Sequence, residues 1–181
     1  TAKGNHIWVQ AIGKAHIQNG KVIKVSGTIQ DITERIKIEK QLMESEEKYR
    51  ELANSLPQIV FETDEKGNIT FVNSNAFDIM GYTKEDFDRG LNTLQMLIPE
   101  DHGRAMENIQ RTLSGETIGG VEYTVLKKDG GTLPVIVNSN LIGSKNKPVG
   151  LRGVIFDISE QKKAEEKINS LNEALRVINK I

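Results

Sequence analysis

The sequence predicts an α+β fold: a five-stranded antiparallel sheet with helices between its second and third strands, flanked by linker helices. Three features of the sequence support this prediction. Residues 58–73 contain two short apolar strand segments, and residues 120–157 contain three more. Between these runs, the apolar spacing becomes helical. Charged segments with heptad-like spacing precede and follow the block. A sheet whose helices are grouped between two runs of strands is an α+β layout.

The chain begins with a predicted β-hairpin. Residues 5–17 and 21–31 are rich in Ile and Val, and Asn19-Gly20 between them is typical of a two-residue hairpin turn. Two strands alone are marginally stable in water. We therefore expect this hairpin to dock either on the following module or on another copy of the chain.

A linker helix is predicted from Thr33 to about Ser55, and Pro57 ends it. Its apolar and aromatic residues recur with heptad-like spacing between charged flanks. They are Ile38, Leu42, Tyr49, Leu52 and Leu56. The segment is therefore predicted to be an amphipathic helix with one apolar seam.

The central block contributes the five strands of the sheet. Residues 58–64 and 69–73 form the first predicted hairpin, around a Gly-Asn turn. Gly120–Lys128, Thr132–Ile142 and Val149–Asp157 form the other three strands, separated by a Gly-Gly turn and a polar loop. The two runs enclose about 45 residues of helical character, which is enough for several helices.

The first helix between the strand runs is predicted over residues 75–80. Asn73 or Ser74 can accept hydrogen bonds from its free amides, and Gly81 can take the left-handed conformation that stops it. The sequence therefore predicts a short, sharply bounded helix.

Three further helices are expected before the sheet resumes. Thr83 with Asp86 fits the start of a short helix, and Leu94–Ile98 forms another. Pro99 then opens a longer amphipathic helix to Ser114, closed by a glycine.

The final segment is predicted to be a helix with a coiled-coil seam. Its apolar residues alternate in spacing of three and four, which favours a parallel dimer or bundle. The alternative is a lone amphipathic helix on its own domain. The expected seam residues are Ala164, Ile168, Leu171, Leu175 and Ile178.

Part of the chain occurs twice. Residues 4–42 match residues 130–168 without a gap, and Asp31-Ile32-Thr33-Glu34 falls on Asp157-Ile158-Ser159-Glu160. A repeat of one strand pair plus one helix indicates tandem modules. We therefore expect the chain to be a piece of a longer protein. The predicted parts are a hairpin from a truncated preceding module (1–32), a linker helix (33–56), one complete domain (57–158) and a C-terminal coiled-coil linker (159–181).

Composition excludes several classes of function. The net charge is −1 and the pI is about 6.3, so no overall field favours nucleic acid. The chain has no cysteine, which excludes disulfides, thiol catalysis and Cys-ligated metal. No apolar run approaches the roughly 18 residues needed to cross a bilayer. We expect a cytoplasmic location and no direct membrane contact for this piece.

The two repeated junctions fit a helix capping box. Asp31 with Glu34, and Asp157 with Glu160, have the spacing at which the Asp accepts from the third helical amide while the Glu reaches back to the cap. Each predicts a firm start for the linker helix that follows.

The space between the sheet and its helices is expected to be either a ligand pocket or a filled core. Its candidate lining is apolar and aromatic, and an apolar stripe is more often core than ligand site. The candidates are Phe61, Phe77, Met80, Leu97, Met106, Ile109, Leu113, Tyr123, Val137 and Phe156.

Several short sequence motifs, in their order along the chain, resemble those of a PAS domain. They are Phe61-Glu62-Thr63-Asp64, Gly67–Asn73, Gly81-Tyr82-Thr83, Ile98–Asp101 and Lys128-Asp129-Gly130. Asp157-Ile158-Ser159 also resembles the Asp-Ile-Thr signature at a PAS C-terminus. The resemblance covers 47–160 as a whole domain and 1–34 as the last two strands of a preceding one. It implies a PAS fold in which the junction between the last strand and the linker helix, called the joint, passes a shift of the sheet to that helix. The joint residues are Asp31, Thr33, Glu34, Asp157, Ser159 and Glu160.

The resemblance also bears on cofactors, and none is predicted. Haem-binding PAS domains carry a His on the long helix, where the nearest match here is Met106, and His102 is expected to be solvated. Flavin photochemistry of the LOV type needs a cysteine, which the chain lacks. His6 and His16 are too isolated for a metal site. An unidentified small molecule remains a candidate occupant of the pocket.

The run from Asn172 to Ile181 resembles the approach to the phospho-accepting helix of sensor histidine kinases, particularly archaeal ones. This implies a two-component phosphorelay: a homodimer through the linker helices, an attached kinase domain and a response regulator. The chain itself carries no predicted catalytic residue. The alternatives are a non-sensing dimerisation spacer, or a PAS sensor for a cyclase, phosphodiesterase or transcription regulator.

Overall fold

The computed structural model describes Gly4 and residues 6–178, with side chains as far as Arg176. The chain forms two compact units, residues 1–51 and 52–181. Within the part of the chain that the structure describes, no helix combines the length and the apolar character needed to cross a membrane.

The first unit contains strands β1 (Val9–Gln18) and β2 (Lys21–Asp31) and most of helix α1 (Thr33–Ser55). The strands pair antiparallel around a turn in which Asn19 has φ 50° and Gly20 has φ 75°. Positive φ at both positions defines the type I′ hairpin turn, which Asn-Gly favours. The apolar side chains of both strands are exposed.

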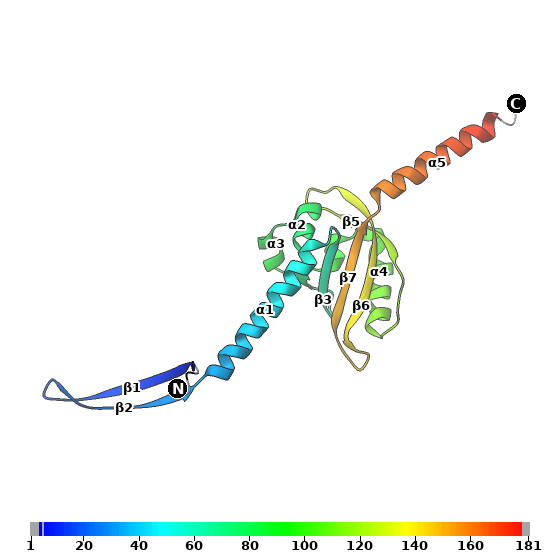
Figure 1. Cartoon of the computed structure of the whole chain (residues 1–181). Coiled ribbons are helices and arrows are strands. Elements are labelled where there is room, and N and C mark those ends of the chain that lie inside the picture. Colours follow the sequence, from blue (N-terminus) through cyan, green and yellow to red (C-terminus); the bar gives the residue numbers. More distant parts are fainter. Residues whose placement is uncertain (1–3, 5, 179–181) are drawn as a thin grey trace. The chain divides into compact units, whose positions relative to one another are not determined.

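The second unit is built on a five-stranded antiparallel sheet (Figure 1), which confirms the predicted α+β class. Its strands run in the order β4-β3-β7-β6-β5, so the last strand lies at the centre. Their bounds are β3 Ile59–Asp64, β4 Ile69–Val72, β5 Val121–Leu126, β6 Thr132–Ser144 and β7 Lys147–Asp157.

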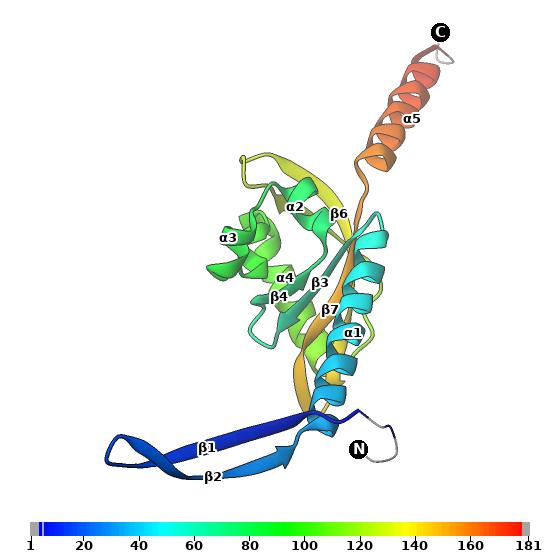
Figure 2. The ribbon, with the colours of Figure 1, turned by 60° about the vertical axis from the view of Figure 1, so that its left-hand side comes forward.

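Four helical segments connect β4 to β5 and cover one face of the sheet (Figure 2). They are α2 (Ser74–Met80), α3 (Lys84–Asp88), the 3₁₀ helix η1 (Thr93–Met96) and α4 (Pro99–Leu113). After the sheet, α5 (Ser159–Ile178) is the last element. The core forms where alternate side chains of the sheet meet α2 and α4. Its buried members are Ile59, Ala76, Met80, Leu97, Ala105, Tyr123, Val125, Leu133 and Val135.

The third predicted helix, Leu94–Ile98, is a 3₁₀ turn that ends earlier, at Met96. Leu97 is extended and forms a β-bridge with Val125. Ile98 is also extended, because the ring of the following Pro99 disfavours helical backbone in the residue before it. The chain therefore leaves the helical conformation to contact β5 before α4 begins.

The predicted capping role of Asn73 is wrong. Asn73 stands at the N-cap of α2, but its side chain makes no capping bond and is only 1% exposed. Its Nδ2 donates to the carbonyls of Ala53 and Gln58, each at 2.8 Å, and its Oδ1 accepts from Val60 N at 3.0 Å. The Asn73 amide therefore bonds backbone groups at the end of α1 and the start of β3, and not the first amides of α2. Asn54 Oδ1 instead accepts from the Ser74 amide, at 2.8 Å.

Candidate functional site

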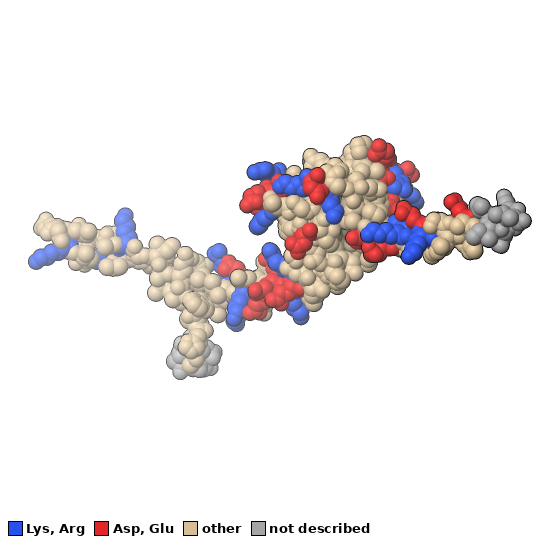
Figure 3. All heavy atoms as spheres, turned by 90° about the horizontal axis from the view of Figure 1, so that it is seen from above, with Lys and Arg blue, Asp and Glu red and all other residues tan. Residues whose placement is uncertain are grey.

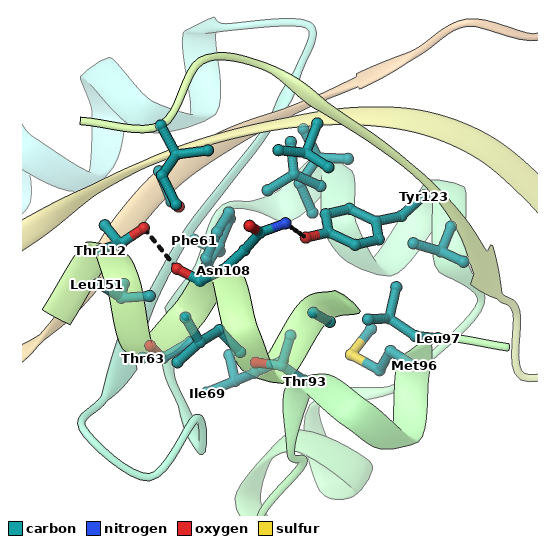
Figure 4. A pocket seen from close by; sticks show the side chains of 18 of the residues that line it. Phe61, Thr63, Ile69, Thr93, Met96, Leu97, Asn108, Thr112, Tyr123 and Leu151 are labelled. Atoms are coloured by element: carbon teal, nitrogen blue, oxygen red, sulfur yellow. Dashed lines mark hydrogen bonds between the residues drawn. The ribbon is translucent and has the colours of Figure 1, made fainter. Parts of the chain in front are cut away.

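A cavity of about 100 Å³ lies between the sheet and the helices of the second unit (Figure 4). Residues of all five strands form one wall, and α2, η1 and α4 contribute the other. Six of the ten residues predicted to line a pocket do line it. They are Phe61, Met80, Leu97, Ile109, Tyr123 and Val137.

The other four predicted residues lie outside this cavity. Phe77 stacks edge-on against Phe87, with ring centroids 6.4 Å apart. Phe156 lies on the opposite sheet face, because its neighbour Ile155 lines the cavity and successive strand residues alternate in direction. Met106 is 52% exposed and Leu113 is half-buried beside the lining. Both are one helical position, about 100°, away from the stripe that faces the cavity.

That stripe of α4 consists of Ala105, Asn108, Ile109 and Thr112. The intervals of three and four residues place all of them on one helix face. Counted from Ala105 instead of Met106, the same helical spacing reaches Asn108 and Thr112. It would therefore have identified both residues from the sequence. Sequence reasoning missed them because it looked for apolar residues alone.

The two polar side chains of α4 that line the cavity are bonded within the protein. Asn108 Nδ2 donates to the Tyr123 hydroxyl at 2.9 Å, and Thr112 Oγ1 donates to the Asn108 carbonyl at 2.8 Å (Figure 4). Asp101, near the start of the helix, accepts from the Thr124 amide at 2.7 Å and so fastens α4 to β5. The wall therefore has a fixed geometry.

The two junctions between sheet and helix share one hydrogen-bond pattern. The Thr33 amide donates to Asp31 Oδ1 at 2.9 Å, and the Ser159 amide donates to Asp157 Oδ1 at 2.8 Å. One residue earlier, Ile158 N donates to the Pro134 carbonyl, as its repeat equivalent does to Trp8. Each linker helix thus begins from an aspartate that ends a strand.

The predicted capping boxes are nevertheless wrong in detail. Each Asp accepts from the amide two residues on, not three, because the helices begin at Thr33 and Ser159. Glu34 and Glu160 point forward instead: they form ion pairs with Lys37 and Lys163, at 3.0 and 2.9 Å. The Asp bond is a local turn that ends the strand and presents the first free amides of the helix.

Both junction aspartates are held in their charged form. Partial burial would raise the pKa of Asp157, but hydrogen bonds from the Ser159 side chain and backbone, with Lys127 and Lys163 nearby, hold that pKa below its ordinary value. The Thr33 side chain and amide lower the pKa of Asp31. A carboxylate at a helix start also interacts favourably with the helix dipole.

The two junctions differ by one hydrogen bond. The Trp8 amide donates to Thr33 Oγ1 at 2.8 Å. Its repeat equivalent is Pro134, which has no N–H, so Ser159 cannot receive the same bond. Lys162 instead ties the start of α5 to β5 through an ion pair with Glu122, at 2.6 Å.

The repeat extends to strand register. Val9 pairs with Asp31 in the first hairpin, and the repeat-equivalent Val135 pairs with Asp157 in the β6–β7 pair. Both pairs also shift register at the same place, after His16 and after Ile142. The β1–β2 hairpin therefore has the same pairing as β6–β7 over its whole length.

The predicted seam on α5 is exposed. Ile168, Leu171 and Leu175 are 55–57% exposed, and Ala164 is also exposed. The side chain of Ile178 lies outside the described residues. The seam thus presents apolar side chains along one helix face.

Two features of the structure bear on metal and nucleic-acid binding. Across Gly4 and residues 6–178, no cluster of three or more His, Cys, Asp or Glu could hold a metal ion. His102 is half-buried rather than solvated as predicted, and its ring bonds the Leu97 carbonyl at 3.1 Å. On the face of the second unit seen in Figure 3, acidic and basic side chains lie beside one another, without a broad basic area.

Comparison with known proteins agrees with this architecture. Residues 69–155 match the family model described as "PAS fold". A crystal structure of a sensory box histidine kinase/response regulator from Burkholderia thailandensis superposes with a TM-score of 0.56 at 21% identity, covering 70% of this chain and 96% of that chain. At that identity the likeness shows the fold.

Two curated relatives are sensors. The methyl sulfide methyltransferase-associated sensor of Methanosarcina acetivorans is 29% identical over 188 residues, which is 97% of this chain and 18% of that protein. Sensor histidine kinase TmoS of Ectopseudomonas mendocina is 31% identical over 127 residues, which is 67% of this chain and 12% of TmoS. The chain spans less than a fifth of either relative. Together with the sheet order and the helices on one face, the family match over 69–155 shows that the second unit has a PAS fold.

Proposed function

We propose that the chain is a sensory PAS module that relays a cue through its linker helices to a histidine kinase. The observation that carries this proposal is the position of Asp157. It ends the central strand β7, and its carboxylate accepts from the first amide of α5. The same strand supplies Leu151 and Ile155 to the cavity wall. One strand therefore connects the cavity to the output helix.

The relay needs two states of the sheet that the cue stabilises unequally. A cue that displaced β7 would move Asp157 and, with it, the first turn of α5. The exposed seam would then carry the change to a second copy as a shift of rotation or register in a parallel coiled coil. The homodimer is part of the proposal.

The kinase output rests on the names of the relatives and on the C-terminal sequence. TmoS is a sensor histidine kinase by name, and so is one solved structure of the same fold. The run from Asn172 to Ile181 resembles the approach to a phospho-accepting helix. In the proposed two-component system, an attached kinase domain phosphorylates a histidine, and a response regulator receives the phosphoryl group. The proposed location of this chain is cytoplasmic.

We also propose that residues 1–32 are the last two strands of a preceding PAS module, followed by a linker helix over 33–56. The matching register of β1–β2 and β6–β7, including the position of the shift, supports this. The junction after Asp31 would then be the output joint of that module. The complete domain, 57–158, would pass its signal to the C-terminal linker, 159–181, through the equivalent joint.

Asp157→Ala in the parent protein tests the relay. The substitution removes the bond to Ser159, and we expect it to uncouple input from kinase output while the fold survives. Autophosphorylation from ATP measures the output, and thermal unfolding checks the fold. Loss of this turn should cost about 1 kcal/mol of stability.

Asp129→Ala is the matched control. Asp129 Oδ1 accepts from the Gly131 amide at 2.8 Å, which is the same kind of bond two residues on, but in a surface turn away from any helix start. We expect this variant to signal like the wild type. If Asp157→Ala also signals like the wild type, the relay proposal is wrong and a spacer role is favoured.

A further inference from the structure

Thr63 carries a buried hydroxyl without a partner. It lies on β3 with Ile59 and Phe61, on the strand face that is buried toward the helices, and it is 4% exposed. Among the described residues, its Oγ1 is the buried side-chain polar atom that has no hydrogen bond. Buried hydroxyls are normally bonded, because leaving one unpaired costs free energy. Thr63 is one of the residues that line the cavity (Figure 4), so an occupant would lie next to this unpaired hydroxyl.

The side chains of Thr93, Thr112 and Asn108, which also line the cavity, form hydrogen bonds with groups other than the Thr63 hydroxyl. Thr93 Oγ1 donates to the Gly67 carbonyl at 2.8 Å, and Thr112 and Asn108 are bonded within the α4 wall. The Tyr123 hydroxyl accepts from Asn108 and keeps its own proton to donate. The cavity therefore offers the Thr63 hydroxyl, the Ser139 hydroxyl and the Tyr123 proton in a mostly apolar surface.

The lining also limits the charge and size of an occupant. None of the described residues that line the cavity is acidic, basic or a histidine. A buried carboxylate or ammonium would have no counter-ion there, and an unpaired buried charge is strongly unfavourable. A space of about 100 Å³ limits an occupant to a small molecule, of the order of a single ring; for comparison, an apolar cavity of roughly 150 Å³ can hold benzene.

We propose that the cavity binds a small, uncharged, mostly apolar molecule whose single polar group hydrogen-bonds Thr63 Oγ1. Such a molecule would be the cue of the proposed sensor. Its role as a cue rests on the proposed sensory function, whereas its binding to the cavity does not. Because β3 pairs with β7 beside Thr63, an occupant held there contacts the strand that leads to Asp157.

Three probes of similar shape test the proposal on the 181-residue chain: phenol, toluene and benzoate. Binding is followed by NMR titration of the methyl groups of Ile109, Val137 and Leu151, which line the cavity. We expect phenol and toluene to perturb these methyls and benzoate not to. Thr63→Val keeps the side-chain shape and removes the hydroxyl. It should reduce the preference for phenol relative to toluene by about 3- to 10-fold, the size expected for one neutral hydrogen bond.

Thr63→Ser is the matched control, because it keeps the hydroxyl and should retain the preference for phenol. Thr63→Ala provides a second hydroxyl-free variant if the valine variant does not fold. The proposal is overturned if no probe perturbs the cavity methyls, if benzoate binds as well as phenol, or if the phenol-to-toluene ratio is the same without the hydroxyl. If Asp157→Ala signals like the wild type while phenol binding is intact, the relay alone is rejected.

Discussion

At the scale of single residues, Asn73 illustrates how a buried amide can hold three segments together. Its side chain bonds the backbone of Ala53 at the end of α1, and of Gln58 and Val60 at the start of β3. Asn73→Ala would remove three hydrogen bonds of a side chain that is only 1% exposed, and each buried group left unpaired costs roughly 1–3 kcal/mol. We expect a loss of about 3 kcal/mol in the free energy of unfolding, measured by urea titration.

Asn75→Ala is the control for that substitution. Asn75 also reaches back to the end of α1, through a bond to the Leu56 carbonyl, but it is only half-buried. Its loss should cost less than about 1 kcal/mol, because water can replace the bond. If both variants lose the same free energy of unfolding, the bonds of Asn73 to α1 and β3 contribute no more stability than the bond of Asn75.

The residue-scale predictions for the cavity succeeded where the side chain was apolar and the face was set by alternation. Phe61, Tyr123 and Val137 follow from strand periodicity once the buried face is known. Phe156 failed because a shift of one residue reverses the face of a strand. Thr63 and Asn108 could not be identified by a search for apolar residues, because both are polar: Asn108 bonds the Tyr123 hydroxyl, and Thr63 carries an unpaired hydroxyl.

At the scale of elements, α5 presents a seam that a partner helix could cover. Leu171→Glu places a charge at the centre of this seam, where burial against a second helix would be unfavourable. We expect the dissociation constant of the dimer to rise at least 10-fold, measured by sedimentation equilibrium of the 181-residue chain. Ser170→Glu introduces the same side chain one residue away, off the seam, and should leave self-association unchanged. Similar association by both variants would remove α5 from the interface.

Elements were most predictable where one residue type has one backbone role. Asn19-Gly20 gave the hairpin turn, and Gly81 ends α2 in the left-handed conformation, with φ 74°. The segment Leu94–Ile98 was mispredicted because the bridge from Leu97 to Val125 competes with helical bonding. Such competition comes from a strand distant in sequence, so local propensity cannot reveal it.

At the scale of the whole molecule, the chain contains two hairpins that share the same strand pairing but differ in their neighbouring strands. The β6–β7 pair is flanked by β3 and β5 and contributes to a core. The β1–β2 pair forms a sheet of two strands, with exposed apolar side chains. Sequence alone revealed the repeat, but the difference in neighbouring strands is a property of the folded chain.

This contrast predicts a large difference in amide hydrogen exchange within one protein. Because two strands alone are marginally stable, we expect β1–β2 amides to exchange at least about 100-fold faster than their repeat equivalents in β6–β7. Ala11 with Val137, and Ile29 with Ile155, are matched pairs, since their cross-strand partners correspond. Equal protection at all protein concentrations would mean that the hairpin is covered within its own chain. Protection that increases with concentration would instead identify a second copy as its partner, which is the other arrangement that an exposed apolar hairpin allows.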